Sequence, residues 1–270
     1  MKLRPVSISV LVFALSLLAV NARANTVDLG SAAGFAVLGG STVTNTGATT
    51  LDGNLGLYPG TSITGSASIT ITGVIDNDNG AAETAQGNLL TAINDLSALP
   101  SSTLSSTTLG ATIFTPGVYS IGALTLNGTV TLNAEGLNNA DFIFLIGSGL
   151  TVNANVVLEN AGTNEGVYWV EEGTSGSAML DAAPGSTFVG NILADESISL
   201  TSGITITCGS ALAYNGAVTL IGDTIDTGCN GSVSSTGTGT SGTTPEPGSL
   251  VLLGTGLLGC VGLLRRKLLA

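Results

Sequence analysis

The chain has 270 residues and a formal net charge of −12 at pH 7, with six Lys or Arg, 18 Asp or Glu and no His. All six cations lie near the two ends, whereas the acidic residues fall between Asp28 and Glu246. The central part therefore cannot form a side-chain salt bridge, hold a phosphate with a side-chain cation or use His in catalysis, and its negative charge argues against nucleic acid as a partner.

Residues 1–24 have the pattern of a secretory signal peptide. Lys2 and Arg4 precede an apolar run over 6–20, and Ala22-Arg23-Ala24 supplies the small residues of a cleavage site. As a helix, that run of about 15 residues would span roughly 22 Å, less than the ~30 Å core of a bilayer. We expect export with cleavage after Ala24, a membrane anchor being the alternative.

Residues 25–230 predict one all-β domain with one long helix. Val, Ile and Leu alternate with Thr, Ser and Asn, most regularly over 62–72, 123–133, 149–158 and 197–207, and Gly or Asn interrupts the alternation every few residues. Such strands bury one face and expose the other. A β-sandwich is the alternative, but the scarcity of aromatic residues favours a narrow solenoid filled by Val, Ile, Leu and Ala, with coils of irregular length.

Residues 81–99 break the alternation and predict a helix. Apolar residues recur there at helical spacing, at Leu89, Leu90, Ile93 and Leu96. Asp78 or Asn79 is placed to cap the N-terminus, and Pro100 ends the helix. An EF-hand loop starting at Asp76 would need its Gly one place later than Gly80 and an acidic residue at its twelfth position, where Gly87 stands, so a helix cap is the better interpretation than a calcium site.

We expect no catalytic residue, no metal and no cofactor. Without His or Lys, hydrolysis would depend on a pair of carboxylates or on a metal held by them. The adjacent acidic pairs are Glu171-Glu172 and Asp195-Glu196. Neighbours along a strand point to opposite faces, so we interpret both pairs as solvated loop charge.

Cys208 and Cys229 are candidates for a disulfide, because the chain is predicted to be exported to an oxidising compartment. Closing a loop of about 20 residues would contribute on the order of 3 kcal/mol. Two unpaired thiols, with Cys208 buried, are the alternative.

The C-terminal end resembles a sorting signal. A linker rich in Gly, Ser and Thr (231–244) leads into residues 245–270, which hold Pro245-Glu246-Pro247, an apolar stretch over 250–264 and the basic residues Arg265, Arg266 and Lys267. This order resembles the PEP-CTERM tail of Gram-negative bacteria. The resemblance implies a precursor inserted in the inner membrane by a transmembrane helix over 250–264, processing by an exosortase, and delivery to the cell surface, to its exopolysaccharide or to the medium. The positive-inside rule gives the same orientation, and an ordinary C-terminal anchor is the alternative.

The domain resembles the microbial ice-binding protein family over about residues 26–226. The resemblance begins at 28–47 (DLGSAAGFAVLGGSTVTNTG) and 53–60 (NLGLYPG preceded by Gly), and it continues through 115–119, 141–147, 188–194 and 211–220. It implies an irregular, discontinuous, triangular β-solenoid of either hand, with an α-helix packed alongside. It also implies that the partner is ice or ordered water, bound by one flat outer face rich in Thr, Ser and Ala.

The physical basis of such a face is its regular spacing. Stacked coils repeat every ~4.8 Å and outward residues along a strand every ~6.8 Å, so hydroxyls and methyls form a nearly planar grid that can order water. The alternation gives these outward candidates: Thr42, Thr44, Thr46, Thr187, Thr205, Thr207 and Thr219. The sequence does not assign them to particular faces, and an ordinary solvated strand position is the better interpretation of any one of them taken alone.

Two other functions stay open. A non-enzymatic structural or adhesive component of the cell surface or exopolysaccharide matrix would also use a rigid, acidic solenoid. A carbohydrate-binding module would expose aromatic platforms, but the adjacent Tyr168 and Trp169 point to opposite faces, which leaves at most one ring exposed.

Overall fold

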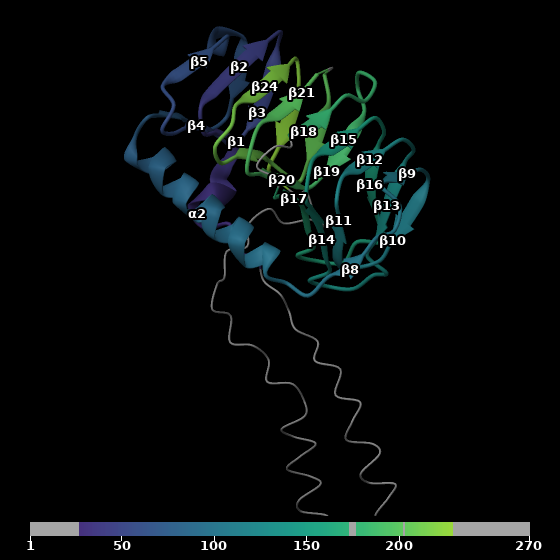
Figure 1. The fold of residues 1–270 in the computed structure, drawn as a ribbon. Helices are drawn as coiled ribbons and strands as arrows, with labels where there is room; N and C mark the ends of the chain where they lie inside the picture. Colours follow the sequence, from purple (N-terminus) through teal and green to yellow (C-terminus); the bar gives the residue numbers. More distant parts are fainter. Residues whose placement is uncertain (1–26, 173–176, 202, 229–270) are drawn as a thin grey trace, which may run out of the picture.

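The computed structural model describes residues 27–172, 177–201 and 203–228, which form an irregular, discontinuous β-solenoid with one helix alongside (Figure 1). Each complete coil contributes one short strand to each of three faces, and the neighbouring strands on every face run parallel. The solenoid expected from the alternation, and the triangular form that the family resemblance implies, are therefore confirmed.

The first face is a nine-stranded sheet. Its strands, in spatial order, are β7 (Ile75–Asn77), β4 (Asn54–Leu57), β1 (Phe35–Gly39), β23 (Ala211–Ala213), β20 (Asn191–Ala194), β17 (Gly166–Glu171), β14 (Asp141–Ile146), β11 (Gly117–Ile121) and β8 (Ser102–Thr103). A short 3-10 helix, η2 (Gly30–Gly34), leads into β1. Helix α2 (Gly80–Ser97) covers the outside of this sheet, so β14 and β17 are buried on both sides and consist of almost continuous apolar runs.

The second face is an eight-stranded sheet. Its strands, in spatial order, are β5 (Ser62–Thr64), β2 (Thr42–Thr46), β24 (Val218–Ile221), β21 (Ile198–Leu200), β18 (Ala178–Leu180), β15 (Leu150–Val152), β12 (Leu124–Leu126) and β9 (Thr108–Leu109). Inward and outward residues alternate along these strands, as in β12 and β15, where a half-exposed Thr stands between two buried aliphatic residues.

The third face consists of two sheets that meet where β16 contacts β19. One sheet holds β10 (Thr112–Phe114), β13 (Val130–Asn133) and β16 (Val156–Glu159). The other holds β19 (Thr187–Val189), β22 (Thr205–Thr207), β25 (Thr224–Asp226), β3 (Thr49–Asp52) and β6 (Ile69–Ile71). A second 3-10 helix, η3 (Ser66–Ser68), lies between β5 and β6.

The coils are not stacked in chain order. The first coil (β1, β2, β3) lies between the second coil (β4, β5, β6) and the last coil (β23, β24, β25), so β1 pairs with both β4 and β23. Strand β7 is at one end of the nine-stranded sheet and β8 at the other, and α2 connects them in the chain along the outside of the sheet (Figure 1). The helix therefore returns the chain to the far end of the stack, from which the remaining coils approach the first one.

Helix α2 confirms the predicted helix to within two residues at each end. Asn79 caps it, because its Oδ1 accepts from the backbone N–H groups of Ala81 and Ala82 at 3.1 and 3.0 Å. The buried residues are Ala82, Ala85, Gln86, Leu89, Ala92, Ile93 and Leu96. Leu90 is only half-buried, so its expected place in the apolar stripe is wrong, and small alanines let the helix lie close to the sheet instead.

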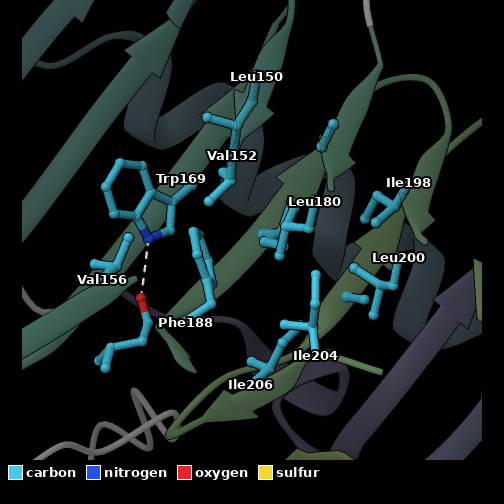
Figure 2. Close-up of a cluster of buried hydrophobic side chains, with 14 of the residues drawn as sticks. Leu150, Val152, Val156, Trp169, Leu180, Phe188, Ile198, Leu200, Ile204 and Ile206 are labelled. Atoms are coloured by element: carbon cyan, nitrogen blue, oxygen red, sulfur yellow. Dashed lines mark hydrogen bonds between the residues drawn. The ribbon is translucent and has the colours of Figure 1, made fainter. Parts of the chain in front are cut away.

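The solenoid core contains more aromatic packing than expected. Phe144 and Trp169 occupy partner positions on β14 and β17, and their ring centroids lie 4.1 Å apart with an interplanar angle of 6°. Parallel strands in register place equivalent side chains directly above one another, which favours ring stacking. Figure 2 shows Trp169 among aliphatic neighbours, with its Nε1–H donating to the carbonyl of Val189 at 3.0 Å. The expectation of a core filled only by Val, Ile, Leu and Ala was wrong in this half of the solenoid.

Candidate functional site

The eight-stranded face carries one continuous outward row across all of its strands, which we call the threonine row. Successive members are Cα partners on neighbouring strands, in the order Thr64, Thr44, Thr219, Ser199, Met179, Thr151, Thr125 and Thr108. All of them are exposed or half-exposed. We call each member of the row a rung. Every rung except Met179 therefore presents a hydroxyl to solvent at the spacing of the coils, ~4.8 Å.

The positions beside the threonine row are also small or uncharged over most of the face. Thr42 and Ser62 are partners on one side of the row, and Thr46 and Ile221 are partners on the other. Beyond β12 and β15, the Nδ2 of Asn153 donates to the Oδ1 of Asn127 at 2.8 Å. These short and mutually bonded side chains give the face a level outer surface.

One carboxylate lies at the edge of this face. Asp181 follows β18, and its Oδ1 accepts from the hydroxyl of Thr201 on the next coil at 2.5 Å. It stands at the corner of the coil and outside the threonine row. The row itself contains no titratable side chain.

The third face also has a row of threonines, but carboxylates accompany it. The row in the five-stranded sheet consists of Thr187, Thr205, Thr224, Thr50 and Thr70. Asp226 and Asp52 lie two residues beyond Thr224 and Thr50 on their strands, and the two Asp residues are Cα partners. Glu159 is an exposed residue of β16. Strongly hydrated carboxylates hold their own water shell and compete with any ordered layer.

The same face is also uneven across the junction of its two sheets. Beyond that junction the outward row changes to Val157, Thr131 and Ile113, and the Ile113 side chain is 68% exposed. The outer surface of the nine-stranded sheet, in turn, is covered by α2. Among the described residues, the eight-stranded face is thus the longest exposed and regular surface, and the carboxylate of Asp181 lies only at its edge.

Comparison with known proteins places this architecture in a family. The sequence pattern of the ice-binding-like family matches residues 37–226. The chain belongs to the ice-binding-like family. It is 38% identical over 270 residues to an ice-binding protein of Nostoc sp. (strain HG1), covering 98% of this ice-binding-like chain and 96% of the relative.

Solved structures of the family have the same fold. An ice-binding protein from an Antarctic biological consortium superposes with a TM-score of 0.68 at 38% identity, covering 74% of this ice-binding-like chain and 90% of the other. An ice-binding protein from the Antarctic ascomycete Antarctomyces psychrotrophicus gives a TM-score of 0.66 at 29% identity, covering 74% and 97%. Residues 243–267 match the PEP-CTERM protein-sorting motif, which indicates export and sorting to the cell surface.

The structure divides the predicted site residues of this ice-binding-like domain between two faces. Thr42, Thr44, Thr46 and Thr219 lie on the eight-stranded face. Thr187, Thr205 and Thr207 lie on the third face, where Thr207 is a partner of Asp226. The seven candidates therefore do not form one surface.

The sequence reasoning missed Met179 and five hydroxyl-bearing members of the threonine row: Thr64, Thr108, Thr125, Thr151 and Ser199. The available signal was a single hydroxyl residue between two aliphatic residues, as in Leu124-Thr125-Leu126 and Leu150-Thr151-Val152. That signal alone was ambiguous, because Val130-Thr131-Leu132 on the third face has the same form.

The acidic residues of this ice-binding-like domain correct one expectation. Glu171, the last residue of β17, is fully buried, so the interpretation of the Glu171-Glu172 pair as solvated loop charge is wrong for Glu171. It has the same inward orientation as Trp169, two residues earlier on the strand. Asp195 and Glu196 do lie in a bend and are half-buried.

Two further carboxyl groups are affected by burial. Burial raises the pKa of Asp141 to about 7, with neighbouring Glu165 acting in the same direction and a hydrogen bond from the backbone of Gly166 opposing it. Burial also raises the pKa of Asp223, against the effect of three backbone hydrogen bonds. Within the described ranges, no three His, Cys, Asp or Glu side chains come together as a metal site would need.

The remaining predictions concern rings, cysteines and the tail. Tyr168 and Trp169 are 2% and 0% exposed, so neither ring offers a platform for a sugar. Cys208 is half-buried, and its predicted partner Cys229 is outside the described residues. The signal peptide, the linker, the sorting residues and the apolar stretch over 250–264 are outside them as well, and none of the described helices has the length and apolar character to cross a membrane.

Proposed function

We propose that this protein binds ice and that the threonine row of the eight-stranded face is its contact surface. The observation that carries the proposal is the unbroken sequence of outward rungs from Thr64 to Thr108, in which only Met179 lacks a hydroxyl. The names of the relative from Nostoc and of the two Antarctic structures support the same function.

The chemistry of the row suits an ordered water layer. Rungs repeat every ~4.8 Å across the strands, and residues such as Thr42, Thr44 and Thr46 repeat every ~6.8 Å along a strand. The Thr hydroxyls can anchor water molecules at these spacings, while the methyl groups limit competing hydrogen bonds. Since the row carries no charge, no strongly hydrated group has to give up its own water shell.

The test is direct measurement of ice activity on residues 25–244. We expect thermal hysteresis and inhibition of ice recrystallisation, both lost when the protein is unfolded by heat. Absence of both activities from the folded protein would contradict the proposal. Co-purification of such an inactive protein with extracellular polysaccharide would support a structural or adhesive role in the matrix instead.

We also propose that the mature protein lacks enzymatic activity. No Lys, Arg or His occurs between Arg23 and Arg265, and Glu165, Glu171 and Asp223 are fully buried. The threonine row has neither an acid–base pair nor a base beside a hydroxyl, and the one hydroxyl–carboxylate pair at the edge of this face, Thr201 with Asp181, has no third group among the bonds of the described residues to orient the carboxylate.

For the ends of the chain, we propose removal of residues 1–24 on export and removal of the 250–264 segment by an exosortase that recognises Pro245-Glu246-Pro247. The match to the PEP-CTERM motif supports this route. Intact mass of surface-associated protein tests it, and a product that still ends at Ala270 would favour a simple membrane anchor. Exopolysaccharide association is tested by the same fractionation.

The Cys208–Cys229 disulfide remains a prediction. The Sγ of Cys208 lies 3.9 Å from the carbonyl oxygen of Gly228, the residue before Cys229. We expect both thiols of the exported protein to react with an alkylating reagent only after reduction. Alkylation of both before reduction would contradict the pairing.

A further inference from the structure

The threonine row crosses a junction that no chain connection holds. The row passes from Thr44 on β2 of the first coil to Thr219 on β24 of the last coil. Other neighbouring coils of the stack follow one another in the chain, so a short corner fixes their relative position. The first and last coils have no such connection, and their register depends on non-covalent bonds. We call this junction the seam.

Buried polar side chains are concentrated at the seam. In the described part of the chain the buried polar or charged residues are Asn45, Thr49, Gln86, Glu165, Glu171, Asn191, Ser210 and Asp223. Four of these, Asn45, Thr49, Gln86 and Asp223, bond to groups of the first or last coil. The seam is therefore held by polar groups in a solenoid that is otherwise mainly apolar inside.

Thr49 is the central member of a network at the corner between the eight-stranded and third faces. Its hydroxyl donates to the Oδ1 of Asn45 at 2.6 Å and accepts from the backbone N–H of Asp223 at 3.2 Å. Thr49 and Asp223 are 174 residues apart in the chain. One buried hydroxyl thus joins the first coil to the last.

Each partner of Thr49 extends the network by one coil. The Nδ2 of Asn45 donates to the carbonyl of Gly65 at 3.2 Å and to the hydroxyl of Ser68 at 2.9 Å, both in the second coil. On the other side, the Oδ1 of Asp223 accepts from the backbone N–H of Ile204 at 2.9 Å, in the coil before the last. The Oδ2 of Asp223 accepts from the backbone N–H of Ile221 at 2.6 Å. The network therefore spans four successive layers of the stack.

The network lies beside the row at the seam. Asn45 follows Thr44 on β2, and Asp223 lies in the short corner between β25 and β24, the strand that carries Thr219. Gln86 of α2 bridges the first and last coils where they meet in the nine-stranded sheet. Its Nε2 donates to the carbonyls of Gly39 on β1 and Ala213 on β23 at 2.8 and 3.1 Å. Two separate buried side-chain contacts thus add to the backbone pairing of β1 with β23, β2 with β24 and β3 with β25 between the first and last coils.

We propose that Asn45, Thr49 and Asp223 are positioning residues of the ice-contact surface, because they hold Thr44 and Thr219 in register across the seam. The inference rests on the proposed ice binding. The network touches no ice. It acts by keeping the two parts of the row, which come from opposite ends of the domain, in one plane with one spacing.

The test compares Thr49→Val with Thr49→Ser in the exported protein. Val has nearly the shape of Thr but can neither donate nor accept, so both bonds are lost, whereas Ser keeps the hydroxyl. We expect Thr49→Val to lose most of its thermal hysteresis per folded molecule and to show faster amide hydrogen exchange in β2 and β24. We expect Thr49→Ser to keep both properties close to those of the unaltered protein.

A control separates positioning from general stability. Trp169→Phe removes the bond to the Val189 carbonyl away from the seam, and it should lower the melting temperature without lowering thermal hysteresis near 0 °C. If Thr49→Val keeps full hysteresis although its melting temperature falls, or if Thr49→Ser loses as much as Thr49→Val, the positioning role is overturned. If Thr49→Val does not fold, Thr49→Ala removes the same hydroxyl, which bonds Asn45 and the backbone N–H of Asp223, and its full retention of hysteresis overturns the role.

Failure of the proposed function can be told apart from failure of this inference. Absence of ice activity in the unaltered protein contradicts ice binding. Hydrogen exchange still decides whether the hydroxyl of Thr49 holds the seam, since unchanged protection of β2 and β24 in Thr49→Val contradicts the network on its own.

Discussion

The two exposed faces of the solenoid are built from the same kind of strand but differ as surfaces. Both alternate inward aliphatic residues with outward Thr, and both carry a row of threonines across neighbouring coils. The third face is interrupted between β16 and β19 and has Asp52, Asp226 and Glu159 among its outward residues. The proposed ice-contact surface is therefore the threonine row whose sheet is continuous and whose neighbouring positions carry less charge.

The largest expected difference in thermal hysteresis comes from placing one bulky side chain on one or the other of the two faces. Thr44 and Thr50 lie on the same coil, are both exposed and face outward on the eight-stranded and third faces. Thr44→Tyr should remove most of the thermal hysteresis, because the ring rises above the grid of the row and keeps the neighbouring hydroxyls away from ice. Thr50→Tyr should leave it unchanged, and equal circular dichroism spectra would show that both variants are folded. Equal losses from the two variants would mean that the contact surface has been assigned wrongly.

A new charge gives the next largest effect. Thr125 and Thr131 belong to one coil, and each is half-exposed between buried aliphatic residues. Thr125→Glu should strongly reduce inhibition of ice recrystallisation, since a carboxylate keeps its own water shell in the row. Thr131→Glu adds the same charge to the third face and should have little effect on activity. Both surface changes should alter stability by less than about 0.5 kcal/mol, and a strong effect of Thr131→Glu alone would assign activity to the third face.

Stability and activity should respond differently to pH. The raised pKa of Asp141, about 7, means that the folded state keeps a proton which the unfolded chain loses near its ordinary value of 3.8. This contribution is fully present below about pH 4 and is lost as the pH rises through about 7, with at most ~4 kcal/mol at stake. Asp223 has a shift in the same direction.

Urea unfolding between pH 4 and 8 measures this dependence. Asp141→Asn should make the stability less dependent on pH without removing the dependence entirely, because Asp223 still titrates. Thermal hysteresis of the folded protein should stay constant over the same range, since the threonine row has no titratable side chain. Stability that rises from pH 4 to 7 would contradict the sign of the shift.

The smallest expected effect is a gain. Met179, 39% exposed, is the one rung of the threonine row without a hydroxyl. Met179→Thr should complete the row and raise thermal hysteresis modestly. Ile113→Thr makes a similar replacement on the third face and should leave activity unchanged. A decrease caused by Met179→Thr would show that the methionine itself contributes to the contact.

The sequence was a good guide to local structure and a poor guide to burial of polar groups. Leu124-Thr125-Leu126 determines which residue of β12 faces outward, because side chains alternate along any strand. The helix over 80–97 was predictable for the same local reason, with Asn79 as its cap and Pro100 beyond its end. By contrast, nothing local distinguishes the buried Glu171 from the half-buried Glu172, since burial depends on which coil packs next to each residue.

What the sequence alone determined is therefore the type of element, the inward or outward direction of each strand residue and, through the resemblance, the family. Only the tertiary structure decided which face each threonine occupies, because the turn at each corner rotates the following strand by an amount that the alternation does not record. It also decided that Thr44 lies beside Thr219, since pairing of the first coil with the last depends on contacts between distant segments. The contact surface proposed for ice is a product of that stacking, and no single segment of the chain contains it.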